Sequence, residues 1–282
     1  MTQRKFIPGS EWLYLKIYTG VKTADIILEE AIQPLVEYFR ENNYISNWFF
    51  IRYNDPKPHL RVRFKLHNTK YYNEVLCYAN TVFQEYVNSG EISTIVIDIY
   101  NREIERYGQD TMESAETLFN MNSDFTLSFL HYDDEEKIIV SLFYIDELFS
   151  RLNLSAHEKL TWTKEFNDAF KKEFNADKKL NSQLDKKYRV FKSKFIDFVQ
   201  AKDFSEERDF ITSNIKSSNT ALQYIVHSSK NRFLEISLKN FFQSIFHMNI
   251  NRLFVSNQRL FEMIIYDYLL RYYKAITYHL SL

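Results

Sequence analysis

Glycine, proline and cysteine are all scarce in this sequence. Four glycines and four prolines occur in 282 residues, whereas average usage is about 7% and about 5%. So few glycines leave no glycine-rich loop to bind a phosphate group, and neither the GxGxxG nor the P-loop pattern occurs. The single cysteine, Cys77, excludes an intrachain disulfide and a four-cysteine zinc site. It lies in an apolar helical pattern, so we expect a buried and inert thiol.

An excess of charge of one sign and long hydrophobic runs are also missing. The 36 Lys and Arg residues nearly balance the 37 Asp and Glu residues, which gives a net charge of −1. This balance is not that of a general nucleic-acid binder, so no direct nucleic-acid partner is expected. No apolar run approaches the ~18 residues of a transmembrane helix, and the polar start, Met1 to Lys5, is unlike a signal peptide. The sequence therefore predicts a cytoplasmic protein without a transmembrane segment.

Aromatic residues are abundant, at 17% of the chain, and regular patterns cover most of it. Alternation predicts strands over 11–18, 46–53, 59–66 and 92–100. Helical spacing predicts helices over 23–40 and 71–87, so the order is βαββαβ, as in ferredoxin-like folds. Beyond residue 111 only helices are expected, over 112–132, 135–151, 156–175, 182–200, 205–228, 232–254 and 257–278.

These patterns predict the α+β class. An N-terminal ferredoxin-like βαββαβ sheet region would occupy residues 1–110, and a mostly helical region would occupy residues 111–282. The chain has no internal repeat, low-complexity tract or Pro/Gly linker. We therefore expect the two regions to form one integrated domain.

The predicted strand His59–Leu66 gathers basic side chains on one face. Because successive strand residues point to opposite faces, His59, Arg61 and Arg63 share a face and the apolar residues between them share the other. Two guanidinium groups on one face can converge on a single carboxylate. The alternative is an exposed edge strand protected by charge. If helices of the second half cover this face, the arginines line a cleft and the binding interpretation is favoured over the exposed edge strand.

A second basic cluster follows the fourth predicted strand, in the segment YNREIERYG (100–108). If this segment is helical, Arg102 and Arg106 lie four residues apart on one side, next to Tyr107. The alternative is a surface turn with internal ion pairs to Glu103 and Glu105, which would contribute little to stability. Spacing alone leaves both interpretations open.

The third cluster lies on a strongly apolar helix near the C-terminus. His247 and Asn251 are four residues apart and share a face, and Arg252 is adjacent. Such polar groups need partners, because burying them unpaired costs several kcal/mol. They are either satisfied core residues or part of a site in which histidine transfers a proton near neutral pH.

At these same positions the sequence resembles one family, the lantibiotic dehydratase C-terminal, or thiopeptide-type bacteriocin biosynthesis, domain. The segments that carry the resemblance are WFFIRYNDPKPHLRVRF (48–64), YNREIERYG (100–108) and HMNINRLF (247–254), and the opening EWLYLKIY (11–18) agrees. The first segment is long and specific, and the other two are shorter but follow in the expected order. The resemblance covers nearly the whole chain.

The resemblance implies an enzyme that modifies ribosomal precursor peptides. In full-length dehydratases of this family, a larger domain esterifies Ser or Thr with glutamate from glutamyl-tRNA. The domain that resembles this chain then eliminates glutamate, which leaves dehydroalanine or dehydrobutyrine. The chain would be a stand-alone lyase subunit of a split dehydratase. A separate tRNA-dependent glutamylating subunit would be its partner, a homodimer stays open, and neither a metal nor an organic cofactor is implied.

The family's functional residues map onto the three clusters. Two arginines would stabilise the enolate, another would bind the carboxylates of glutamate, and the histidine would accept or relay a proton. The catalytic positions implied are Arg61, Arg63, one of Arg102 and Arg106, and His247. Candidates for substrate binding are His59, Tyr107, Asn251 and Arg252.

Two other functions remain open. Some relatives of this domain are thiopeptide pyridine synthases, which join two dehydroalanines in a formal [4+2] cycloaddition and release the leader peptide. The retained arginines and histidine favour elimination over that reaction. A non-catalytic subunit that binds the precursor peptide, by strand addition at a sheet edge, is the other alternative. RNA binding would rest on fold analogy alone, and the chain has no RNP-type aromatic motif.

Overall fold

The computed structural model describes residues 2–280 and contains two compact units. Unit 1 consists of Met1–His131 and Gln223–Ser256, and unit 2 consists of Tyr132–Leu222 and Asn257–Leu282. The chain therefore leaves unit 1 after its first 131 residues and returns to it for one later segment. The α+β class is confirmed, with an antiparallel four-stranded sheet at the N-terminal end followed by a mostly helical half.

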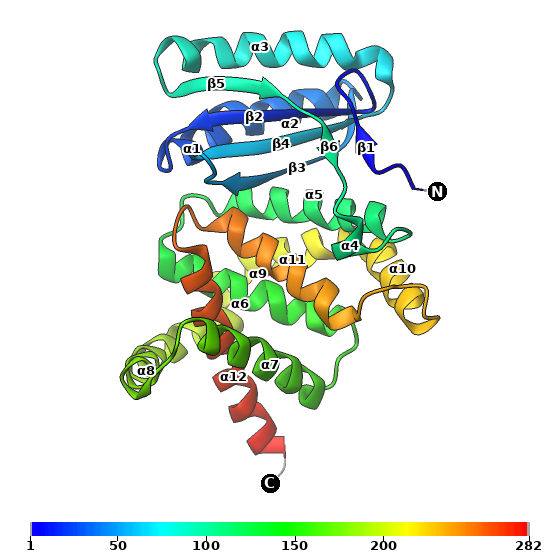
Figure 1. Ribbon diagram of the computed structural model, residues 1–282. Coiled ribbons are helices and arrows are strands. Elements are labelled where there is room, and N and C mark those ends of the chain that lie inside the picture. The colour runs from blue at the N-terminus through cyan, green and yellow to red at the C-terminus, as the bar shows by residue number, and fades with distance from the viewer. Residues whose placement is uncertain (1, 281–282) are drawn as a thin grey trace. The chain divides into compact units, whose positions relative to one another are not determined.

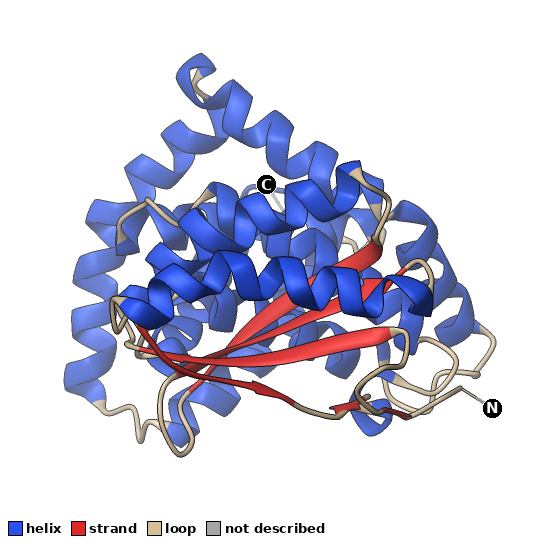
Figure 2. Cartoon of the chain, turned by 90° about the horizontal axis from the view of Figure 1, so that it is seen from above, coloured by secondary structure: helices blue, strands red, loops and turns tan. Residues whose placement is uncertain are grey.

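The sheet of unit 1 contains β2 (Trp12–Thr19), β3 (Ile45–Tyr53), β4 (His59–Leu66) and β5 (Ile92–Ile97). Their order in space is β3-β4-β2-β5, and all three neighbouring pairs are antiparallel. The strands lie side by side in one sheet when viewed from above (Figure 2). β4 has the bounds that its alternating sequence predicts.

Helices on one side of this sheet complete its core. They are α1 (Thr23–Ile26), the π-helical turn η1 (Ile27–Ile32), α2 (Gln33–Glu41), the short η2 (Thr69–Tyr71) and α3 (Tyr72–Asn88). Leu60, Val62 and Phe64 of β4 are fully buried in this core, as alternation predicts. The prediction that Cys77 is buried is wrong, because α3 turns Val75 and Ala79 toward the core and leaves Cys77 exposed.

The fourth predicted strand, over 92–100, is also wrong in its extent. β5 ends at Ile97, and Tyr100–Asn101 forms a separate strand, β6, which pairs with β1 (Lys5–Phe6) in a second, two-stranded sheet. Asp98 separates the two strands: its carboxylate accepts a hydrogen bond from the main-chain N–H of Ile99 and forms an ion pair with Lys16. The alternation of residue types carries no information about such a local side-chain interaction, so it did not predict the end of β5.

Unit 1 also contains α4 (Ile104–Tyr107), α5 (Met112–Ser128), α11 (Leu238–Leu253) and most of α10 (Asn219–Lys230). Unit 2 contains α6 (Asp134–Arg151), α7 (Ala156–Glu173), α8 (Lys178–Gln200), η3 (Lys202–Phe204), α9 (Ser205–Ser217) and α12 (Gln258–Leu280). Within residues 2–280, no helix has the length and apolar character needed to cross a membrane.

Two predicted helices are wrong in their bounds. The pattern over 205–228 is two helices that meet at Ser218, whose hydroxyl donates to the main-chain carbonyl of Ile215 and competes with helical hydrogen bonding. The pattern over 232–254 begins as a helix only at Leu238, because Ser237 caps it by accepting a hydrogen bond from the N–H of Asn240.

Side chains of α5 bind the outer edge of β3. β3 has β4 on one side only, so alternate main-chain groups face away from the sheet. Asn120 Oδ1 accepts from the N–H of Trp48 at 3.1 Å, and Ser123 Oγ accepts from the N–H of Phe50 at 3.3 Å. Both partners come from α5, which lies beside β3 in Figure 1.

Side chains of α11 continue the same row. The Asn251 amide pairs with both main-chain groups of Arg52: Oδ1 accepts from the N–H at 3.0 Å and Nδ2 donates to the carbonyl at 3.0 Å. Arg252 Nε donates to the carbonyl of Phe50 at 2.7 Å. Side chains of α5 and α11 thus provide the hydrogen-bond partners that another strand would otherwise give to the main chain of β3.

Replacing Asn251 with Ala is expected to destabilise unit 1, because it leaves the main-chain N–H and carbonyl of Arg52 without partners. A buried group left unpaired costs about 1–3 kcal/mol. Urea unfolding of Asn251→Ala and of Asn80→Ala, an exposed mid-helix position on α3, measures the difference. The exposed variant should unfold like the natural protein or at a slightly higher urea concentration, because Ala has a higher helix propensity than Asn. Equal unfolding midpoints for the two variants would contradict this account of the edge.

Candidate functional site

The predicted basic strand lies in the middle of the sheet of unit 1, and its basic face is turned away from α2 and α3. Register places Arg63 between Tyr14 of β2 and Phe49 of β3, and Arg61 between Lys16 and Ile51. These side chains form cross-strand rows on one surface. The interpretation of His59–Leu66 as an edge strand is wrong, because β4 has a neighbour on both sides.

A cleft of about 350 Å³, counting the space open to solvent, lies within unit 1 between this face and the later helices. β3, β4, β6, α4, α5 and α11 all contribute to its walls. The lining therefore combines three segments that are far apart in the sequence. Its polar and charged lining residues include Arg63, Tyr100, Glu103, Tyr107 and Arg252.

Arg63 is the unusual group in this cleft. The side chain is only 7% exposed, and its guanidinium carbon lies 4.3, 5.0 and 5.1 Å from the ring centres of Tyr14, Tyr100 and Phe49. Nε and Nη1 are buried and have no hydrogen-bond partner within the described chain. Burial lowers the pKa of the Arg63 guanidinium, although arginine keeps its proton in proteins. A buried cation without an anion is costly, and a bound carboxylate would compensate it.

Arg61 lies next but one along β4 and is oriented by His59. His59 Nδ1 is 2.8 Å from the carbonyl oxygen of Lys57, which can only accept, so Nδ1 carries the proton. Nε2 is therefore the acceptor for Arg61 Nε at 3.0 Å. Burial first, and the neighbouring Arg61 charge in addition, lower the pKa of His59. The neutral ring holds the Arg61 guanidinium 3.4 Å from the ring centre of Tyr53.

Arg102 is buried in a fully paired environment. Its Nε and Nη2 donate to the two carboxylate oxygens of Glu116 at 2.7 and 2.6 Å, and Nη1 donates to the carbonyl of Gln3 at 3.1 Å. Burial lowers the pKa of Arg102, but hydrogen bonds to Glu116 and its charge outweigh this and raise it overall. The Tyr100 hydroxyl also donates to Glu116, at 2.8 Å. This buried trio fixes Tyr100 beside Arg63.

Arg106 and Tyr107 follow on α4. Arg106 is exposed, and its Nε lies 3.3 Å from Glu103, a residue of the cleft wall. Tyr107 lines the cleft and packs edge-on against Phe119 and Phe241, with ring centres 4.9 and 5.6 Å apart. Burial raises the pKa of the Tyr107 hydroxyl, so it stays protonated.

The later helix α11 contributes Met248 and Arg252 to the cleft, and His247 is the half-buried residue just before Met248. Arg252 Nη1 donates to Asn122 Oδ1 at 2.9 Å, in addition to its bond to β3. The structure thus gathers Arg63, Tyr107 and Arg252 around one cleft. Arg61 and His59 lie on the same sheet face, whereas Arg102 and Asn251 make packing contacts outside the cleft lining.

Sequence reasoning missed Tyr14, Tyr100 and Glu116 as parts of the site. Tyr14 has the alternation of a strand, but only the register of β2 against β4 places it opposite Arg63. Glu116 carries no local signal, because its partners lie 14 and 16 residues earlier in the chain. Within residues 2–280, no group of three or more His, Cys, Asp or Glu side chains is arranged to hold a metal ion.

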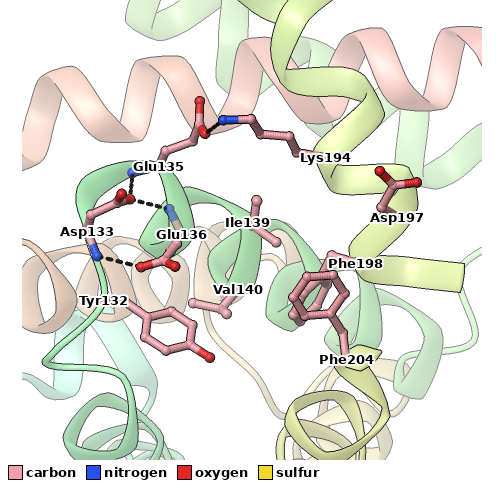
Figure 3. Close-up of a pocket in the computed structure, with 10 residues that line it drawn as sticks. All are labelled: Tyr132, Asp133, Glu135, Glu136, Ile139, Val140, Lys194, Asp197, Phe198 and Phe204. Atoms are coloured by element: carbon pink, nitrogen blue, oxygen red, sulfur yellow. Dashed lines mark hydrogen bonds and ion pairs between the residues drawn. The ribbon is translucent and has the colours of Figure 1, made fainter. Parts of the chain in front are cut away.

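A second cavity lies within unit 2 and holds none of the predicted site residues. It measures about 800 Å³, counting open solvent, and is formed by α6, α8 and η3. Figure 3 shows its acidic rim, where Asp133 and Glu136 form the capping box of α6 and Glu135 pairs with Lys194. Three of its four carboxylates are thus occupied by local interactions, and none of its lining residues is an arginine or a histidine. The cleft of unit 1 is therefore the better candidate site.

Comparison with known proteins identifies relatives along the whole chain. The family model for the C-terminal part of lantibiotic biosynthesis dehydratases matches residues 12–273. The nisin biosynthesis protein NisB of Lactococcus lactis subsp. lactis is 26% identical over an alignment that covers 98% of this chain and 27% of NisB. The chain therefore spans about a quarter of the length of that relative.

Two solved structures share the fold. The tRNA-dependent lantibiotic dehydratase MibB from Microbispora sp. 107891 superposes with a TM-score of 0.69 at 19% identity, over 94% of this chain and 28% of MibB. The pyridine synthase TbtD from thiomuracin biosynthesis superposes with a TM-score of 0.63 at 11% identity, over 96% of this chain and 100% of TbtD. At these identities the likeness concerns the fold alone.

Two of the buried arginines, Arg63 and Arg102, should respond differently to replacement by methionine. Arg102→Met strands the buried Glu116 carboxylate and is expected to lower the free energy of unfolding by about 3–5 kcal/mol. Arg63→Met removes an unpaired charge from an aromatic cage and should leave stability unchanged or raise it by roughly 1 kcal/mol. Denaturant unfolding midpoints give both values. A loss for Arg63→Met as large as that for Arg102→Met would show that Arg63 is a structural residue.

Acidification should weaken the fold through His59. Its pKa in the folded protein lies below the ordinary value of about 6.5, so the unfolded chain binds a proton that the folded protein excludes. Stability is therefore expected to fall as the pH drops below about 6.5. His59→Gln should reduce this loss, as measured by thermal unfolding across that pH range. If the thermal stabilities of the natural protein and of His59→Gln fall in parallel as the pH drops, His59 is not the cause.

Proposed function

The chain belongs to the family of lantibiotic biosynthesis dehydratase C-terminal domains, and we propose that within this family it is a glutamate-elimination enzyme. Its substrate is a ribosomal precursor peptide whose Ser or Thr side chains carry a glutamyl ester. The reaction is a lyase-type β-elimination that yields dehydroalanine or dehydrobutyrine. The observation that carries the proposal is Arg63, a buried guanidinium in a cleft with two nitrogen atoms lacking partners.

The elimination breaks two bonds of the esterified residue. A base takes the proton from Cα, the electron pair forms the Cα–Cβ double bond, and glutamate leaves Cβ with the ester oxygen as a carboxylate. Negative charge therefore develops first on the peptide carbonyl oxygen next to Cα and then on the leaving carboxylate. A preorganised positive environment stabilises both.

Residues in the cleft and beside it suit these two charges. Arg63 has unused N–H donors in a water-poor aromatic surrounding, where an ionic hydrogen bond is strong. We assign it to the leaving carboxylate. Arg61, which His59 holds in one orientation, is assigned to the developing enolate. His247, on the helix that also lines the cleft, is assigned as the proton acceptor or relay.

The contacts also support a choice between Arg102 and Arg106. Every nitrogen of Arg102 donates to Glu116 or to the carbonyl of Gln3, so its role would be to position Tyr100. Arg106 is exposed, and its ion pair with Glu103, at 3.3 Å, is also exposed and lies at the cleft. We therefore propose Arg106 as the arginine that meets the free carboxylates of glutamate. Tyr107 and Arg252 would line the peptide-binding wall.

The proposed reaction needs an esterified peptide, so a separate glutamylating, tRNA-dependent dehydratase is the proposed partner. A second candidate function is the cycloaddition of dehydroalanines with release of the leader peptide. The observation that favours it is the superposition on TbtD, which covers the full length of that pyridine synthase. No cofactor is proposed for either reaction.

Incubation of a glutamylated precursor peptide with this protein alone tests the proposal. Mass spectrometry should show the loss of one glutamic acid per ester. Arg63→Met and His247→Asn should each slow the reaction by about 10²–10³-fold, the effect of removing one transition-state contact or a proton acceptor. Lys65→Met, on the same strand face, is the matched control and should remain active.

The outcome that opposes elimination is equally clear. If the ester persists while the peptide binds, the protein is not an eliminase. A peptide containing two dehydroalanines then tests the cycloaddition, with a cyclised product and a free leader peptide as the readout. If both substrates bind unchanged, the protein is a presenting subunit.

A further inference from the structure

The two edges of the four-stranded sheet in unit 1 are treated differently. The β3 edge is occupied by side chains of α5 and α11, as described above. The opposite edge is β5, which pairs with β2 on one side only. Most of β5 is exposed, and the apolar side chains of Val96, Ile97 and nearby Ile99 are 39, 39 and 43% exposed.

The register of β5 shows which main-chain groups are available. The N–H of Asp98 donates to the carbonyl of Tyr14 at 3.1 Å, and antiparallel pairing alternates from there. Thr94 and Val96 therefore turn their main-chain groups toward β2, whereas Ile95 and Ile97 turn theirs outward. No turn or side-chain hydrogen bond within residues 2–280 uses these outward groups.

The register of β5 against β2 shifts once, at Ser93 near the start of the strand, and the edge from Thr94 to Ile97 beyond it is regular. The composition of this part leaves the edge unprotected. The strand reads ISTIVI, without a charged residue or a proline between Glu91 and Asp98. Proteins usually block a free edge with lysine, proline, a bulge or a covering element, because an open edge pairs with other chains. A short, uncharged edge with two outward residues is the form that accepts an added peptide strand.

We propose that an extended segment of the precursor peptide docks on this edge as an added strand next to β5. The choice of occupant rests on the proposed function, in which a precursor peptide is the substrate. A second copy of this chain fits less well. A stable interface buries about 800 Å² on each partner. The area of three partly exposed apolar side chains is a small fraction of that. A peptide needs only the main-chain hydrogen bonds, which are available whatever its sequence.

The position of the edge suits delivery to the cleft. Val96 lies in register with Lys16, and Lys16 with Arg61, so alternate side chains of an added strand emerge on the Arg61 face. Neighbouring strands are about 4.8 Å apart, which places the docked segment roughly 14 Å from β4. About five extended residues cover that distance. A docked segment could therefore hold residues a short distance along the peptide within reach of the arginines.

Ile97→Pro tests the proposal. Proline removes the outward N–H and places its ring on the free edge, whereas the ladder to β2 uses residues 94, 96 and 98. The matched control is Ile97→Ala, which loses the side chain but keeps the N–H. With a fluorescently labelled, unmodified ribosomal precursor peptide of the lantibiotic type as the probe, Ile97→Pro should weaken binding by about tenfold or more. KM for elimination should rise while kcat is kept, and the control should bind within about twofold.

Hydrogen exchange on the natural protein gives a second measurement that does not depend on how the variant folds. Adding the unmodified peptide should slow exchange of the Ile95 and Ile97 amides. Unchanged exchange, or equal binding by Ile97→Pro, overturns the docking proposal even if elimination is observed. If the peptide protects these amides but no elimination is observed, the proposed activity is wrong and the docking proposal stands. Protection that appears without peptide, grows with protein concentration and accompanies a dimer in sedimentation assigns the edge to a second copy and also overturns the proposal.

Discussion

The main-chain groups on the free side of β3 constrain the rest of unit 1. A strand edge buried against helices needs a hydrogen-bond partner for each polar group, and α5 and α11 provide these partners as side chains. The same contacts fix how α11 lies against the sheet. Arg252 donates a hydrogen bond to β3 and also lines the cleft. The contact that satisfies the strand edge is therefore also part of the cleft wall.

Two of the buried arginines, Arg102 and Arg63, have contrasting surroundings. Arg102 has a bidentate carboxylate and a carbonyl, so its charge is compensated within the protein. Arg63 has aromatic faces instead, which attract a cation but leave its N–H groups unused. The first arginine holds Tyr100 in the wall, and the second keeps two buried N–H groups that have no acceptor within the described chain. Buried donors without acceptors are typical of sites that trade stability for binding.

The abundant aromatic residues have a related role. In the cleft of unit 1, Phe49, Tyr100, Tyr107 and Phe119 pack edge-on against one another, and together they surround the arginines with low-polarity surface. Electrostatic attraction between a guanidinium group and a carboxylate is stronger there than in water. The scarcity of glycine fits the same design, since the cleft is built from side chains on strands and helices and not from a backbone loop.

The sequence by itself determined the α+β class, the bounds of β4 and the shared face of Arg61 and Arg63, because strand periodicity fixes which side chains point together. It also placed the helix that carries His247 and Arg252. Only the tertiary structure decided that β4 is a central strand, that β1 pairs with β6, that Asn251 binds the main chain of Arg52, and that Arg102 is paired while Arg63 is not. The physical reason is that periodicity reports which way a side chain faces, whereas partners 14 to about 200 residues away are chosen by packing in three dimensions.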